Sequence, residues 1–503
     1  MIQAQDQLAL DALARGEPAL VWRTQVADTD TPVAAALKLI RPGRGDFLLE
    51  SVEGGAVRGR YSLVGLAPDL IFRARGGVAE INRRWAIDRE AFEPIADDAL
   101  TAMRQLVTAS RMAVPEGLPR ALACLVGYFA YETIGLVEKL PRPAANPLDL
   151  PDMLFARPTL ILIFDRLADQ LFMVAPLWPE APGDPAAKLA DAIERIETHA
   201  ATLAGPLPPR SHSDVDPQAL EPAPQLDASR YAEMVSEAKR YIAAGDIFQV
   251  VLAQRFTMDF ALPPIDLYRA LRRINPSPFL YFLDLPGFAL IGSSPEILVR
   301  ARDGEVTIRP IAGTRPRGRT ALEDAAQRES LLADPKERAE HLMLLDLGRN
   351  DVGRVAQAGT VEVTDSYIVE HYSHVMHIVS NVVGRLDPAK DALDALFAGF
   401  PAGTVSGAPK VRACEIIAEL EPETRGAYAG GVGYFSPDGS MDSCIVLRTA
   451  VVKDGVMHVQ AGAGIVADSD PAYEQRECEA KARALVTAAK EALKLAASPD
   501  FGQ

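Results

Sequence analysis

The sequence predicts a mixed α+β protein with large β-sheets and helices beside them. Runs of apolar residues with few charges indicate buried strands within 121–132 and 159–177. Apolar residues at helical spacing indicate helices over 184–204 and 230–245, and a glycine ends the second. Because helices and strands are mixed without strict alternation, an α+β architecture is favoured over a barrel or a doubly wound fold.

A proline-rich stretch divides the chain. Residues 205–229 contain six prolines and little apolar periodicity, which is typical of a connector. We predict an N-terminal domain over 1–205, a connector over 206–229 and a second domain over 230–495. Strands are predicted in the second domain at 248–260, 279–285, 288–301, 377–386, 443–452 and 456–466.

Composition limits the partners that the protein takes. The chain has 503 residues, of which 48% are hydrophobic and 24% charged, as in ordinary soluble proteins. Its 68 acidic residues outnumber its 52 lysines and arginines, and the formal charge of -16 repels a polyphosphate backbone. We therefore expect no nucleic-acid partner, and an anionic substrate would need a local positive cluster or a metal ion.

Cysteine usage and hydropathy indicate the compartment. The four cysteines lie far apart without zinc-like spacing, which fits a reducing environment. No stretch reaches the roughly 18 consecutive apolar residues of a membrane-spanning helix. We expect a cytoplasmic protein with no membrane partner.

Two glycine-containing segments suggest anion binding. The first, RPIAGTRPRG at 309–318, lacks the spacing and the lysine of a phosphate-binding P-loop. The second has glycines at 462 and 464, but the next helix is predicted to begin only at Asp470-Pro471, too late for dinucleotide binding. Glycines after a strand let backbone N–H groups approach an anion. A turn that simply requires glycine is the alternative.

Two segments of the same form carry paired carboxylates. In 334–344 and 470–485 an Asp-Pro pair opens a helix, and two glutamates follow at a spacing that puts them on one helix face. The pairs are Glu337 with Glu340, and Glu474 with Glu477. If the two helices converge, these carboxylates form an oxygen-rich site that suits Mg²⁺.

Each carboxylate pair also has a structural interpretation. Glu337 stands at the third helical position after Asp334, as in a capping box. Glu477 stands four residues before Lys481, as in an ion pair on a helix surface.

Other candidate groups are isolated. Glu296 follows a Ser-Ser-Pro turn, where burial would raise its pKa and suit it to act as a general acid. His377 begins a predicted strand and could act as acid, base or orienting group, or could be a core histidine with its hydrogen bonds satisfied. The segment 400–420 places Gly, Thr and Ser before a helix, either as an anion site or as a cap.

Taken together, these segments resemble the chorismate-utilising enzymes, and most closely the anthranilate synthase component I group. The resemblance covers nearly all of 230–490 and, before the connector, chiefly LLES at 48–51. The segments that carry it are FLLESVEGGAVRGRYSLVG, GDIFQVVLAQR, NPSPFLYFL, GSSPEILVR, RPIAGTRPRG, DPKERAEHLMLLDLGRND, HVMHIVS, FPAGTVSGAPKVRACEII, RGAYAGGVGYFSPDGSMDSCIVLRTAVV and AGAGIVADSDPAYEQRECEAKARAL.

The resemblance implies both a fold and an activity. The fold is a large two-layered arrangement of sheets and helices, in which an N-terminal regulatory part packs against a C-terminal catalytic part. The activity is conversion of chorismate and ammonia to anthranilate and pyruvate with Mg²⁺, the first committed step of tryptophan biosynthesis. Glu340 and Glu477 would hold the metal, supported by Glu337 and Glu474.

The resemblance also assigns the substrate site. Glu296 would protonate the leaving ring hydroxyl, and His377 with Gly313 and Thr314 would orient the ring and assist elimination. Tyr428 and Arg448 would bind the enolpyruvyl carboxylate. The remaining substrate contacts implied are Gly462, Ala463, Gly464 and Lys481.

Two positions separate the group from its relatives. Enzymes of the family that add water have a lysine base where this chain has Gln249, which cannot abstract a proton. Aminodeoxychorismate synthases typically have a nucleophilic lysine where this chain has Ala312. Ammonia is therefore the implied nucleophile.

A regulatory site is implied as well. The family binds tryptophan, its end-product inhibitor, away from the active site with the LLES and NPSP segments. The corresponding residues here are Leu49, Glu50, Ser51, Pro278, Phe279 and Leu280. For LLES alone, a buried strand end is the alternative.

The chain contains no Gly-x-Cys-x-Gly-x-Gln glutaminase motif. A separate glutamine amidotransferase subunit, component II, would therefore supply the ammonia. Aminodeoxychorismate synthase component I and aminodeoxyisochorismate synthase are alternative enzymes. A catalytically silent tryptophan-binding regulator is the alternative outside enzymes, against which the intact Glu296, Glu340, His377, Arg448 and Glu477 argue.

Overall fold

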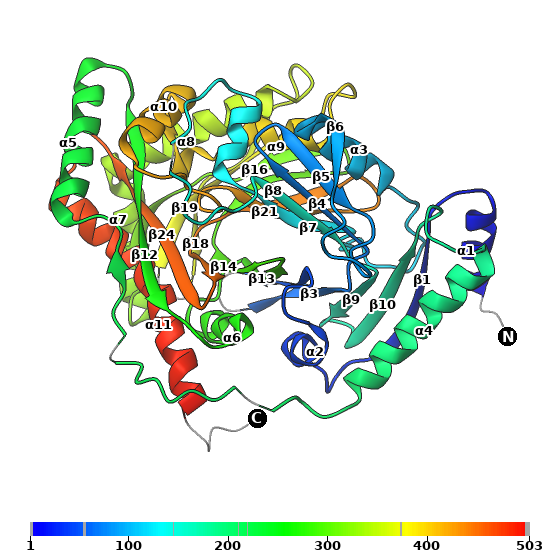
Figure 1. Ribbon diagram of the computed structural model, residues 1–503. Helices are drawn as coiled ribbons and strands as arrows, with labels where there is room; N and C mark the ends of the chain where they lie inside the picture. Colours follow the sequence, from blue (N-terminus) through cyan, green and yellow to red (C-terminus); the bar gives the residue numbers. More distant parts are fainter. Residues whose placement is uncertain are drawn as a thin grey trace.

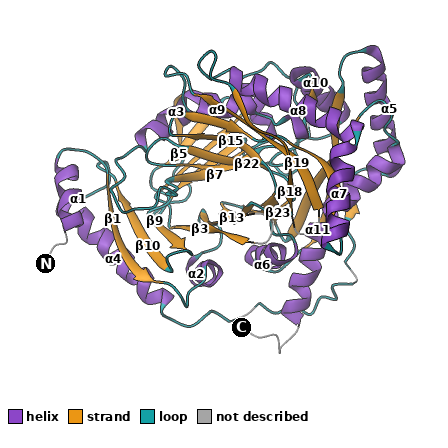
Figure 2. Cartoon of the chain, turned by 180° about the vertical axis from the view of Figure 1, so that it is seen from behind, coloured by secondary structure: helices purple, strands orange, loops and turns teal. Residues whose placement is uncertain are grey.

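The computed structural model describes residues 4–53, 57–143, 145–209, 211–218, 220–372 and 375–497. Residues 54–56 of the segment that contains LLES lie outside this described part. Two 12-stranded sheets face each other, and helices cover their outer sides (Figures 1 and 2). Apolar residues of both sheets, such as Phe47 and Ile71, form a shared core between them. The predicted α+β class is confirmed.

The first sheet runs from the N-terminal strands to the C-terminal ones. Its order is β1 (Ala19–Val26), β10 (Gln170–Leu177), β9 (Leu160–Asp165), β3 (Val57–Leu66), β2 (Asp46–Glu53), β13 (Phe279–Leu285), β14 (Phe288–Ser294), β23 (Thr449–Lys453), β24 (Val456–Ile465), β12 (Gln249–Asp259) and β11 (Ala223–Pro224), and β20 (Gly407–Ala408) also pairs with β12.

The second sheet is built in the same mixed way. Its order is β17 (Ile311–Pro316), β19 (Val375–Arg385), β16 (Glu305–Ile308), β15 (Ile297–Arg302), β22 (Met441–Ile445), β21 (Gly431–Phe435), β7 (Leu125–Phe129), β8 (Met153–Arg157), β4 (Leu70–Arg75), β5 (Val78–Asn82) and β6 (Glu93–Asp98), and β18 (Glu362–His371) also pairs with β19.

Each sheet has its own helices. Those in contact with the first sheet are α1 (Ala4–Ala14), α2 (Pro32–Leu39), α4 (Pro185–Leu203), α5 (Ala228–Ala244), α6 (Pro264–Ile274), α10 (Lys410–Leu420) and α11 (Pro471–Ala497). Those in contact with the second are α3 (Ala99–Ala109), α7 (Ala321–Ala333), α8 (Pro335–Gly353) and α9 (Ala392–Gly399). None of the helices in the described ranges is long and apolar enough to cross a membrane.

Strands from before and after the connector share both sheets. In the first sheet β2 pairs with β13, and in the second β7 pairs with β21. Backbone hydrogen bonds within both sheets therefore join the two parts. The division into domains at 1–205 and 230–495 stays a prediction.

The two segments 288–301 and 443–452, each predicted as one strand, are each two strands in different sheets. The chain leaves the first sheet after β14, turns at Pro295-Glu296 and enters the second sheet as β15. It returns from β22 to β23 through a turn that contains Arg448, whose φ of 47° lies in the left-handed region. Pro295 cannot donate to a strand ladder, so pairing stops there. Glu296 and Arg448 consequently occupy two corners between the sheets.

The predicted helix starts at the two carboxylate segments are confirmed. The Asp334 side chain accepts hydrogen bonds from the backbone N–H groups of Lys336 and Glu337, and Pro335 occupies the first turn of α8. The Asp470 carboxylate accepts from the backbone N–H of Tyr473 at 2.8 Å at the start of α11. These caps fix where the first turns, and therefore their glutamates, lie.

Candidate active site

Glu296 is a buried carboxyl at the first corner between the sheets. Thr404, in the short 3₁₀ turn Gly403–Val405, donates a hydrogen bond to Glu296 Oε1 at 3.0 Å. Burial raises the pKa of Glu296 to about 8, against the opposing effects of the Thr404 hydrogen bond and the Arg448 charge. Glu296 therefore holds a proton at neutral pH, as a general acid requires. The sequence indicates only that Thr404 precedes a helix, and it does not predict the contact with Glu296.

His377 meets Gly313 and Thr314 across paired strands. Its Nδ1 lies 2.9 Å from the Gly313 carbonyl oxygen and 3.1 Å from Thr314 Oγ1. A bulge in the β17–β19 ladder and the φ of 69° at Gly313 turn this carbonyl toward the ring. Burial lowers the pKa of His377, so the imidazole is neutral. Donation of the Nδ1 proton to Gly313 leaves Nε2 free to accept.

Tyr372 is a site residue that the sequence analysis missed. Its ring lies edge-on to the His377 ring, with centroids 5.4 Å apart. Burial raises the pKa of Tyr372, and the charges of Glu370 and Glu296 raise it further. Tyr372 stands shortly before the segment HVMHIVS that contains His377, and its own pattern there gave no signal.

The glycines of β24 allow two side chains to approach the backbone. A Cβ at Gly464 would lie 2.5 Å from Gln249 Nε2, and one at Gly462 would lie 2.8 Å from the Tyr428 hydroxyl. The side chains of Gln249 and Tyr428 thus lie against β24, the strand that also contains Ala463. Gln249 Oε1 is buried and has no hydrogen-bond partner within the described residues. An unpaired buried oxygen of this kind suits a ligand that donates a hydrogen bond.

A buried ion pair supports Tyr428 from behind. Arg425 and Glu421 have side chains only 1% and 3% exposed and pair at 2.6 Å. The Arg425 guanidinium lies over the rings of Tyr131 and Tyr428, 4.7 and 5.5 Å from their centroids. It also donates to the carbonyl of Val405, at the end of the turn that holds Thr404, at 2.7 Å. The sequence analysis missed both charged residues.

The starts of α8 and α11 lie near each other, since Lys336 in the first turn of α8 pairs with Asp468, just before α11, at 3.1 Å. Burial raises the pKa of Glu340, and the charges of Glu337 and Glu477 raise it further. Burial also raises the pKa of Glu474, to which the Glu477 charge adds. Lys481 pairs with Glu477 at 2.7 Å and donates to the Gly462 carbonyl at 2.9 Å, which links α11 to β24.

Both structural interpretations of the carboxylates are also present. The backbone of Glu337 is capped by Asp334, and its carboxylate pairs with Arg315 at 3.0 Å. Glu477 pairs with Lys481. Within the described part of the chain, no three His, Cys, Asp or Glu side chains form a group that could hold a metal ion by themselves.

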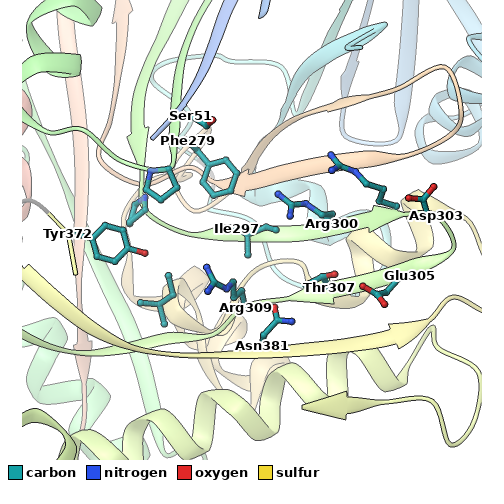
Figure 3. Close-up of a pocket in the computed structure, with 14 residues that line it drawn as sticks. Ser51, Phe279, Ile297, Arg300, Asp303, Glu305, Thr307, Arg309, Tyr372 and Asn381 are labelled. Carbon is teal, nitrogen blue, oxygen red and sulfur yellow. The ribbon is translucent and has the colours of Figure 1, made fainter. Parts of the chain in front are cut away.

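The LLES and NPSP segments lie side by side. In the β2–β13 ladder Glu50 is opposite Leu280, and Leu49 is opposite Tyr281. Ser51, Pro278 and Phe279 line a cavity of about 780 Å³ (Figure 3).

Glu50 has a different environment from Ser51. It is buried, and it accepts hydrogen bonds from Arg272 at 2.5 Å, from Tyr268 at 2.7 Å and from Arg166. Burial alone would raise the pKa of Glu50, but these partners hold it below its ordinary value. Glu50 therefore anchors β2 beside the cavity.

Comparison with known proteins identifies the class. The chain matches the family described as chorismate binding enzyme over residues 59–487, and it belongs to this family. The matched range includes the corner residues, the histidine strand and both carboxylate helices.

Individual relatives are more specific. The chain is 52% identical over 477 residues to anthranilate synthase component 1 of Cereibacter sphaeroides, covering 95% of each chain. It is 47% identical to anthranilate synthase component 1 of Thermus thermophilus, covering 93% of this chain and 96% of the relative.

Solved structures agree on the fold. Anthranilate synthase component I from Streptococcus pneumoniae superposes with a TM-score of 0.74 at 36% identity, covering 85% of this chain and 92% of that one. The isochorismate synthase MenF of Escherichia coli has a TM-score of 0.71 at 22% identity, covering 96% and 99%, and shares the fold.

Proposed function

We propose that this protein is the synthase subunit that converts chorismate and ammonia to anthranilate and pyruvate. The observation that carries the proposal is a pair of buried groups, a protonated Glu296 and a neutral His377, on both of which the charge of Arg448 acts. A pair of titratable groups whose surroundings shift their pKa values in opposite directions is typical of an acid–base site. The relatives are named anthranilate synthase component 1, and an acid–base site of this kind suits the reaction that this name describes.

The chemistry of the residues gives each a role. Glu296 donates its proton to the ring hydroxyl, which leaves as water. Ammonia adds at the ring carbon next to the one that bears the carboxylate, and the ring double bonds shift toward the carbon that the hydroxyl leaves. Pyruvate is then eliminated, and loss of a ring proton leaves the aromatic product. Arg448 and Tyr428 bind the enolpyruvyl carboxylate, and His377 with Thr314 orients the ring for elimination.

The choice of nucleophile follows from what two side chains lack. Gln249 is an amide that cannot activate water as a base, and Ala312 is buried and has no amine. Ammonia from solution, or from a separate glutamine amidotransferase subunit, is therefore the nucleophile. We place this assembly in the cytoplasm and the reaction in tryptophan biosynthesis.

The four glutamates fit a Mg²⁺ ion that is held jointly with substrate. Burial raises the pKa of Glu340, and the charges of Glu337 and Glu477 raise it further, so a cation would relieve this repulsion. Mg²⁺ characteristically takes one or two protein carboxylates and completes its shell with water and oxygens of an anionic ligand. Glu340 and Glu477 would hold it with support from Glu337 and Glu474, and the ion would neutralise the ring carboxylate.

We also propose inhibition by tryptophan at the cavity of Ser51, Pro278 and Phe279. The cavity has aromatic and proline walls and several arginines, which suits an aromatic amino acid. Ser51 is on β2 and Phe279 on β13, and neither Gln249 nor Lys481 lines the cavity, which distinguishes it from the proposed substrate site.

The test is turnover by the purified chain with chorismate, ammonium and Mg²⁺. We expect anthranilate fluorescence to rise together with an equal amount of pyruvate, and chelation of the metal or Glu340→Gln to abolish both. Glu233→Gln, on the exposed face of α5, is a matched control that should retain activity.

Other products would point to other functions. An amino intermediate that accumulates without pyruvate indicates aminodeoxyisochorismate synthase. A para-amino product indicates the aminodeoxychorismate enzyme. Tryptophan binding without any turnover indicates a silent regulator and contradicts the proposal.

A further inference from the structure

The cavity that contains Ser51 reaches the candidate active site at its other end. Pro295 and Ile297, the neighbours of Glu296, line the cavity, as do Arg309 and Tyr372 (Figure 3). Successive residues of an extended chain point to opposite sides. Glu296 accordingly faces Thr404, while its neighbours face the cavity. The corner is thus a wall shared by the two sites.

An ion pair connects this wall to His377. Arg309, which follows β16, pairs with Glu370 on β18. The Tyr372 hydroxyl donates to the same carboxylate, at 3.0 Å from Glu370 Oε2. Glu370 is the register partner of His377 in the β18–β19 ladder, and the Tyr372 ring contacts the His377 ring. One side of this cluster therefore faces the cavity and the other faces His377.

The other arginines of the cavity lack such a connection. Arg300 and Arg302 both pair with Asp442, at 3.0 and 3.4 Å. These pairs join β15 to β22, and in Figure 3 Arg300 lies to the right of Phe279 while Tyr372 lies to its left. They provide an internal comparison for residues that line the cavity without touching His377.

We propose that Arg309, Glu370 and Tyr372 form a relay through which a ligand in the cavity controls the active site. The inference rests on the proposed function, with tryptophan as the ligand. Its carboxylate competes with Glu370 for Arg309. Glu370 then loses its counter-ion, and Tyr372, which is bonded to it, shifts against His377.

The exposure of the pair makes this competition feasible. The side chains of Arg309 and Glu370 are 34% and 28% exposed, so their ion pair is partly solvated and weak. An α-carboxylate brought into the cavity by the burial of its own aromatic side chain can therefore replace Glu370. A ligand shifts an equilibrium only through such differential contacts.

The experiment separates binding from coupling. Tyr372→Phe retains the ring that lines the cavity but loses the hydroxyl that bonds Glu370. L-tryptophan binding is measured by calorimetry, and inhibition is measured as the factor by which saturating L-tryptophan lowers kcat/KM for chorismate with ammonium. We expect the dissociation constant to change by less than about threefold while the inhibition factor falls about tenfold.

Two further variants make the outcome decisive. Glu370→Gln removes the charge that competes for Arg309 and should likewise reduce the inhibition factor more than it changes binding. Arg302→Gln should change binding and inhibition by the same factor. The relay would be overturned if Tyr372→Phe and Glu370→Gln each changed the dissociation constant and the inhibition factor equally, or changed neither.

Failure of the relay is distinguishable from failure of the proposed function. An unmodified protein that makes anthranilate but is not inhibited by L-tryptophan overturns the relay and leaves the activity intact. A protein that makes no anthranilate overturns both.

Discussion

At the residue scale, the protonation states of Glu296 and His377 follow from burial. Desolvation favours the neutral form of each group, so it raises the pKa of the carboxyl and lowers that of the imidazole. Both groups are then in the form that the proposed reaction uses, an acid that holds its proton and a ring that can accept one. Their position between the two sheets is what removes them from water.

The pH dependence of kcat should report Glu296. With a pKa of about 8, the carboxyl is protonated below this pH and loses its proton above it, so kcat should be full below and decline as pH rises through this value. Glu296→Gln cannot donate a proton, and we expect kcat to fall about 100- to 10,000-fold. Anthranilate fluorescence across a pH series measures both.

Thr404 provides the control for this assignment. Its hydrogen bond lowers the pKa of Glu296, so Thr404→Val should move the alkaline decline of kcat to higher pH, and Thr404→Ser should restore it. An unchanged pH profile in Thr404→Val would mean that another group limits the rate.

The arginines of RPIAGTRPRG are each paired with carboxylates. Arg309 pairs with Glu370, Arg315 with Asp334 and Glu337, and Arg317 with Asp324. They brace the strand that carries Gly313 and Thr314 against α7, α8 and β18. This explains a basic loop in an acidic protein without any phosphate.

At the element scale, the ends of strands position the residues of the candidate site. The ends of β14 and β22 place Glu296 and Arg448 where neither sheet continues, and β24 brings its glycines to the same region. The turn Gly403–Val405 completes the site because Gly403 lies against α8, where a Cβ would be 2.1 Å from the Leu347 side chain. The buried Arg425 holds this turn and Tyr428 in place.

The ion pair of Arg425 should therefore be important for stability. Arg425→Met leaves Glu421 buried without its counter-ion, and breaking such a pair lowers the free energy of unfolding by about 3–5 kcal/mol. Urea denaturation measures the change. Arg15→Met removes the partner of Glu17 in a pair that is 60% and 56% exposed, and should lower the free energy of unfolding far less than Arg425→Met does. Similar losses in both variants would contradict the structural role of Arg425.

At the scale of the whole molecule, the two sheets join the parts of the chain that precede and follow the connector. β2 from the N-terminal part lies between β3 and β13, so the cavity of Ser51 is built from both parts of the chain. The same β13 leads through β14 to the corner at Glu296. A ligand in the cavity therefore contacts the framework of the active site.

Filling the cavity should relieve inhibition. The Ser51 hydroxyl occupies the space over Gly59, where a Cβ would lie only 1.7 Å from it, so a larger side chain has to enter the cavity. We expect Ser51→Phe or Ser51→Arg to raise the half-inhibiting concentration of L-tryptophan at least about tenfold while activity is largely retained. Ser51→Ala leaves the cavity open and should have a smaller effect. Unchanged inhibition in Ser51→Phe would place the effector elsewhere.

The sequence by itself determined the local elements and the residue types of the site. The Asp-Pro caps, the apolar periodicity of α4 and α5 and the strands β12, β13, β19 and β24 depend on neighbouring residues, so they could be predicted. The resemblance supplied the roles proposed for Glu296, His377 and Arg448. It could do so because these residues stand within recognisable segments.

Only the tertiary structure decided which residues meet. Thr404 lies 108 residues from Glu296, and Arg309 lies 61 residues from Glu370, so no local pattern records either contact. The same is true of the two predicted strands that divide between the sheets, since periodicity reports burial but not the sheet in which a strand is buried. These contacts depend on how the two sheets pair across the connector. Sequence patterns could not predict these contacts because the pairing of strands that are distant in the sequence depends on the free energy of the whole core.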